Sequence, residues 1–126
     1  MLIRTDQDVA AKSVDMPGAS NVRMRVMLGR ADGAPTFAMR IFEIEPGGHT
    51  PLHEHNFEHE VVVLAGQGEA LNGDQAHPIA AGHMLLVEPN ERHQFRNTGQ
   101  TLLKIMCLVP LSYETGDGRT EPTPGS

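Results

Sequence analysis

All seven histidines of this 126-residue chain fall between positions 49 and 93. Three of them, His53, His55 and His59, stand close together in the segment 46–60, and His93 lies further along. Neutral imidazole is the commonest protein ligand for transition metals and the usual proton carrier near neutral pH. The clustering therefore points to a metal or proton-transfer site built from the middle of the chain.

Spacing decides which of these side chains can converge. Residues two apart in a β-strand share a face, so His53, His55 and His59 point the same way if the strand is regular. Glu60 has the opposite parity and points away. Three imidazoles are therefore favoured over two imidazoles plus Glu60. A β-bulge between His55 and His59 would reverse that choice.

A fourth imidazole, His93, can join the set if its strand neighbours the first one in a barrel. Three or four neutral imidazoles suit one divalent transition metal per chain: manganese, iron, copper, nickel, cobalt or zinc. Magnesium and calcium prefer oxygen ligands and are not expected. His49, His77 and His83 are interpreted as surface or structural residues.

The segments that carry these residues have the pattern of strands. No segment shows an apolar repeat of 3.6 residues over ten or more positions, and the best helix candidate, 7–14, is short. Strands are expected over 21–28, 36–45, 60–64, 83–87, 94–97 and 101–109, with turns at 46–48, 66–68, 72–74, 89–90 and 97–99. This spacing predicts an antiparallel sandwich or barrel.

Length and charge limit the classes of protein that remain. A chain of 126 residues is one domain, and its single cysteine, Cys107, excludes an internal disulfide. No apolar run approaches the roughly 18 residues of a membrane span, and the first residues lack a signal-peptide core, so a cytoplasmic location is expected. The net charge of −6, without a Lys/Arg cluster, argues against a nucleic-acid partner.

The segment 46–66 resembles the first motif of the cupin superfamily, written G-x5-H-x-H-x3,4-E-x6-G. Four residues stand at the motif's spacings: Gly47, His53, His55 and Gly66. His59 occupies the place of the usual glutamate in the x3 version. Glu60, in the x4 register, is the alternative third ligand if the strand bulges.

The segment 82–97 resembles the second cupin motif, written G-x5-P-x-G-x2-H-x3-N. Gly82, His93 and Asn97 match its spacing, whereas the proline is displaced by one residue to Pro89. Asn90 stands where the second glycine belongs, and asparagine is the residue other than glycine that best accepts a positive φ. The resemblance covers residues 36–110.

The resemblance implies an all-β, single-domain cupin with a double-stranded β-helix, or jelly-roll barrel. Residues 1–35 would be lead-in strands, 36–110 the barrel core with both motifs, and 111–126 a C-terminal segment with a flexible tail. It also implies a metal site of His53, His55, His59 and His93, as in a subgroup of small four-histidine cupins. Such a ligand set carries no charge, which favours anionic ligands such as enolates, carboxylates or superoxide at the remaining positions.

We expect a metal-dependent, dioxygenase-like oxidoreductase that acts on a small organic substrate. The alternatives are a non-redox cupin enzyme, such as a sugar isomerase, epimerase or lyase, and a non-catalytic metal- or ligand-binding module. No catalytic residue can be named from the sequence. A non-redox reaction needs acid–base or polar groups, and the candidates are Glu43, Glu60, Arg40 and Tyr113.

Parity also predicts what lines the barrel. Cys107 is expected to face inward near the metal. We interpret it as a small buried residue in preference to a redox-sensitive thiol. Phe95 is expected to form a cavity wall. Asn97 is a structural strand-end residue. Arg40 is interpreted as an edge charge in preference to an interior cation. Both faces of the strand 36–45 are partly apolar, which suggests a homodimer.

Overall fold

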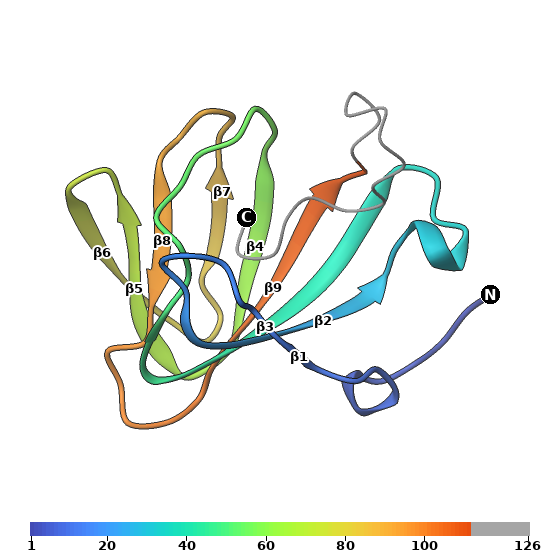
Figure 1. Cartoon of the computed structure of the whole chain (residues 1–126), viewed down its shortest axis with the longest axis horizontal. Helices are drawn as coiled ribbons and strands as arrows, with labels where there is room; N and C mark the ends of the chain where they lie inside the picture. Colours follow the sequence, from blue (N-terminus) through green and yellow to red (C-terminus); the bar gives the residue numbers. More distant parts are fainter. Residues whose placement is uncertain (112–126) are drawn as a thin grey trace.

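The computed structural model describes residues 1–111, so the expected C-terminal tail from residue 112 and Tyr113 lie outside the described residues. Nine strands make up most of this part (Figure 1). They are β1 (Lys12–Ser13), β2 (Ser20–Leu28), β3 (Phe37–His49), β4 (His59–Ala65), β5 (Gln67–Asn72), β6 (Gln75–Ala80), β7 (Met84–Val87), β8 (His93–Arg96) and β9 (Leu103–Pro110). Two short 3-10 helices, η1 (Asp6–Asp8) and η2 (Arg30–Asp32), complete it. The best helix candidate from the sequence, 7–14, contains only the end of η1 and the strand β1. No helix among residues 1–111 is long and apolar enough to span a membrane.

The strands form one antiparallel sheet in the order β6-β5-β8-β3-β9-β4-β7, with β2 paired to β3 and β1 to β2. The sheet curls so that its two ends face each other, as Figure 1 shows. One core cluster accordingly joins Ala70, Ile79 and Phe95 of one end to Val61 and Val87 of the other. The all-β jelly-roll architecture implied by the sequence is confirmed.

Strand β3 runs through the segment where the sequence predicts a turn at 46–48. Gly47 absorbs the irregularity with a φ of +81°, a conformation that glycine adopts without a side-chain clash. At Gly48 there is no room for a side chain, because a Cβ atom there would lie 2.7 Å from the Ser20 carbonyl oxygen. The strand therefore continues, and its last residue, His49, pairs with Arg96 of β8. Because β3 extends to His49, the chain reaches the segment 53–59, which holds His53, His55 and His59, directly after this strand.

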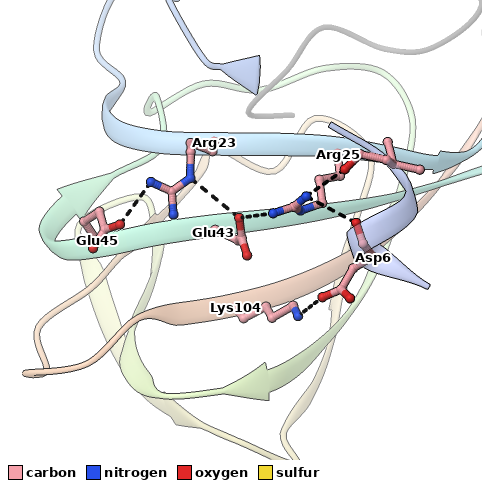
Figure 2. Close-up of polar contacts among 7 residues, drawn as sticks. Asp6, Arg23, Arg25, Glu43, Glu45 and Lys104 are labelled. Atoms are coloured by element: carbon pink, nitrogen blue, oxygen red, sulfur yellow. Dashed lines mark hydrogen bonds and ion pairs between the residues drawn. The ribbon is translucent and has the colours of Figure 1, made fainter. Parts of the chain in front are cut away.

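Side chains of β2 cover part of the outer face of β3, and the neighbouring strand β9 contacts the N-terminal segment. Glu43 accepts from Arg25 at 3.3 Å and lies 3.6 Å from Arg23, while Lys104 of β9 pairs with Asp6 (Figure 2). Contacts within the chain thus account for the burial of Glu43, whereas Phe37 at the start of β3 is 56% exposed.

Candidate metal centre

The two sequence motifs meet at a backbone bridge. His53 N–H donates to the carbonyl of His93 at 3.1 Å, and His93 N–H donates to the carbonyl of His53 at 2.9 Å. His55 follows in a loop, and His59 opens β4. The parity argument was conditional on a regular strand through 53–59, and the structure has none there, because only an isolated bridge at His53 precedes β4. The histidine side chains converge because the bridge pairs His53 with His93 and because the chain then turns back into β4, which begins at His59.

The structure brings all four sequence-predicted ligands into one cluster. His53, His55 and His93 each offer a ring nitrogen, and these atoms all lie within 4.8 Å of one another. His59 adjoins this group, with its Nε2 2.6 Å from Nε2 of His55 and its ring centroid 5.2 Å from that of His93. His59 and His93 are buried, whereas His53 and His55 are half-buried.

The alternative ligand Glu60 lies on the opposite side of β4. Its side chain is exposed, whereas His59 has an exposed fraction of 0%. Consecutive residues of a strand point to opposite faces, and the first two residues of β4 follow that rule. Glu60 is therefore outside the cluster, whose described members are all imidazoles.

Two of these imidazoles have their tautomer fixed by the backbone. Nδ1 of His55 lies 3.0 Å from the Phe57 carbonyl oxygen, and Nδ1 of His93 lies 2.8 Å from that of Glu91. A carbonyl can only accept, so each Nδ1 carries the proton and each Nε2 keeps its lone pair. Nε2 of His93 is buried and has no hydrogen-bond partner among the described residues. Such a nitrogen suits a metal, because metal-bound histidines commonly donate their other ring N–H to a carbonyl.

Burial keeps two of the imidazoles, His55 and His59, neutral. It lowers the pKa of His55 to about 4, with the neighbouring His93 adding to the effect. Burial also lowers the pKa of His59 far below its usual range, and the positive charge of Arg40 acts in the same direction. Only neutral imidazole binds a metal. These two side chains are thus held in the metal-binding form at neutral pH.

Behind His59 stand two further buried side chains, Cys107 and Arg40, with exposed fractions of 1% and 0%. The Cys107 sulfur lies 2.8 Å from Nδ1 of His59, and Nη2 of Arg40 donates to the same sulfur at 3.6 Å. The interpretation of Arg40 as an edge charge is wrong. Strand β3 is not an edge, since β2 and β9 pair with it on both sides.

A cavity of about 260 Å³ opens beside the cluster, between β5, β7 and β8. His93 and Phe95 line it together with apolar residues, so the expected role of Phe95 as a cavity wall is confirmed. Its polar lining includes Glu91, which accepts from Asn72 and from the Glu88 backbone N–H. Sequence analysis did not single out Glu91. Its position two residues before His93 is the signal that could have found it.

The other candidates from the sequence take structural positions. The buried Asn97 bonds the carbonyls of Ile44 and Thr101, as expected of a strand-end residue. His49 contacts Gln94, and His83 accepts from the Ala80 N–H. Exposed His77 lies at the cavity wall on β6. Glu43 is directed to the outer face, where Arg23 and Arg25 bind it.

Known proteins with this fold have varied activities. The chain resembles the polyketide cyclase RemF from Streptomyces resistomycificus, at 30% identity and a TM-score of 0.81, over 87% of this chain and 80% of that one. It is 28% identical to an oxalate-binding protein from Thermotoga maritima over 88% of this chain and 94% of that protein. It is 34% identical to the 1-methylthio-D-xylulose 5-phosphate methylsulfurylase of Rhodospirillum rubrum over 59% of this chain, which spans about half (47%) of that relative's length.

The family model of the cupin domain matches residues 40–109, more than half of the chain. This range contains all of β4 to β8 and most of β3 and β9, together with the histidine cluster. By fold, by motif and by family match, the chain belongs to the cupin family.

Proposed function

We propose that this cupin is a metal-dependent enzyme whose centre consists of His53, His55, His59 and His93. One observation carries the proposal: four inward imidazoles converge, and the buried Nε2 of His93 has no other partner among residues 1–111. A divalent first-row metal held there would supply Lewis acidity and, for iron, manganese or copper, redox chemistry with dioxygen.

The surrounding charges favour an anionic substrate. No carboxylate belongs to the described cluster, and Arg40 places a buried positive charge behind His59. The cavity beside His93 is lined mainly by apolar side chains and encloses about 260 Å³. These features together suit a small organic molecule with an apolar body and an enolate, phenolate or carboxylate end.

The leading reaction is dioxygenation of such a substrate, with both atoms of dioxygen entering the product. Support comes from the all-imidazole cluster and from the mainly apolar lining of the cavity beside it. The residues of the chain would then orient the substrate and exclude water, with His93 and Phe95 forming the wall beside the metal.

A non-redox reaction is the second candidate, and the 30% identity to a polyketide cyclase favours it. In that case a carbonyl of the substrate is polarised and a carboxylate moves the proton. Glu91, at the cavity wall beside His93, is the group positioned for this role. A non-catalytic ligand-binding module is a third possibility, which the similarity to an oxalate-binding protein supports.

The experiment compares protein loaded with iron, manganese or zinc, with and without oxygen, on β-diketones, phenols and polyketide-like diketides. Oxygen uptake coupled to substrate loss, absent with zinc, supports dioxygenation. Turnover with zinc under nitrogen supports the non-redox reaction and excludes dioxygenation. Saturable binding without turnover under any condition selects the binding module.

A homodimer stays a prediction. Two side chains on the edge strand β7, Met84 and Leu86, are 81% and 59% exposed and lie beside an open apolar groove. Burial of such side chains against a second copy would favour association. The molecular mass measured by light scattering tests this prediction.

A further inference from the structure

Three buried side chains from three adjacent strands form a row that ends at the metal centre. Arg40 of β3 pairs with Cys107 of β9, and Cys107 pairs in turn with Val61 of β4. His59 precedes Val61 by two residues and therefore shares its face of β4. The register of the sheet thus sets Arg40, Cys107 and His59 side by side, with exposed fractions of 0%, 1% and 0%.

The two ring nitrogens of His59 face different partners. Nε2 is directed to the cluster, 2.6 Å from Nε2 of His55, whereas Nδ1 lies 2.8 Å from the sulfur of Cys107. An imidazole that binds a metal through Nε2 must carry its proton on Nδ1, and that proton needs an acceptor. His55 and His93 use backbone carbonyls for this purpose. For His59 the neighbouring atom is sulfur.

Arg40 contacts the same sulfur. A guanidinium can only donate, so Cys107 accepts from Nη2 of Arg40 at 3.6 Å. The buried sulfur is thus held between the Arg40 guanidinium and the His59 ring. A cysteine that merely filled space would need neither contact.

We propose that Cys107 is a positioning residue: its sulfur accepts the Nδ1 proton of His59 and presents Nε2 to the metal as the fourth ligand. Arg40 supports the sulfur in this role. The inference rests on the proposed four-histidine centre, and it explains how the ring that replaces the usual glutamate is oriented.

The test compares wild type with Cys107→Val, which keeps the volume without an acceptor, and Cys107→Ser, which keeps an acceptor. Co(II) is the probe, and the readouts are its dissociation constant and its visible absorption spectrum. We expect Cys107→Val to weaken Co(II) binding about 10–100-fold and to change the spectrum, since loss of such outer partners has effects of this size. The Co(II) dissociation constant of Cys107→Ser should stay within about threefold of the wild-type value, and its Co(II) spectrum should match that of wild type.

Val109→Ala is the matched control, because Val109 is a buried residue of β9 on the same face as Cys107. It should lower thermal stability and leave the Co(II) spectrum unchanged. The inference is overturned if Cys107→Val binds Co(II) with the affinity and spectrum of wild type, or if Cys107→Ser loses as much as Cys107→Val. Absence of Co(II) binding by wild type overturns the four-histidine centre itself, and the inference with it.

Discussion

His53 and His93 lie 40 positions apart in the chain and exchange backbone hydrogen bonds in both directions, at 3.1 and 2.9 Å. Their ring centroids stand 5.4 Å apart. The bridge fixes one histidine of each cupin motif in a single register. The position of the histidine cluster is therefore set in part by main-chain pairing.

The third ligand can be tested by changing neighbouring residues. His59→Phe should reduce metal affinity by at least about tenfold. Loss of a residue that binds the metal directly should cost no less affinity than loss of a residue that only hydrogen-bonds to such a ligand. Glu60→Gln should leave the metal affinity unchanged, because that side chain is exposed on the other face of β4. Isothermal titration with Zn(II) measures both. Loss of affinity in Glu60→Gln alone would show that β4 bulges and that the assignment of His59 is wrong.

Backbone proximity makes one glycine of the first motif irreplaceable. Gly66 has a φ of +83°, and a Cβ there would lie 2.3 Å from the Leu102 carbonyl oxygen. Gly66→Ala should destabilise the fold by about 2–5 kcal/mol, combining backbone strain with overpacking. The matched control is Gly73→Ala, at a φ of +61° with nothing within 4 Å, which should cost only about 1 kcal/mol. Equal losses in urea unfolding would contradict the clash at Gly66.

The N-terminal segment should make stability depend on acid pH. The hydrogen bond from Lys104 lowers the pKa of Asp6 below its ordinary value. A carboxyl with a depressed folded-state pKa stabilises the fold above its unfolded pKa of about 3.9, and this contribution is lost as the pH falls through the folded value.

The free energy of unfolding of wild type should therefore exceed that of Asp6→Asn at pH 7, and the difference should vanish as the pH falls below about 4. Asp74→Asn, in the exposed β5–β6 turn, is the control. A difference between wild type and Asp6→Asn that is constant from pH 7 to pH 3 would show that Asp6 acts through packing.

Sequence patterns predicted the fold class and most of the sheet, for identifiable reasons. Strand β2 alternates apolar residues with arginine over 22–26, and β9 alternates buried with half-buried positions around Lys104. Strands β5 and β6 were missed because they hold glycine, alanine and glutamine with little alternation. Their hairpin is specified by pairing around Gly73 and Asp74.

The site could be predicted in part from residue types alone. Parity selected the inward histidines, although the segment before His59 is a loop. The positive φ of Asn90, at +65°, followed from its place in the second motif. The contacts of Arg40, Cys107 and His59 depend on the register of three strands far apart in sequence. No local pattern encodes that register, so Arg40 was assigned to an edge.

Metal content tests the central claim most directly. Protein purified from its own host should contain one divalent first-row metal per chain by elemental analysis, and the His53→Ala/His55→Ala variant should contain none. His83→Ala, outside the cluster, should keep the wild-type content. A wild-type chain without such a metal, or a double variant that retains it stoichiometrically, would contradict the assignment of the histidine cluster as a metal centre.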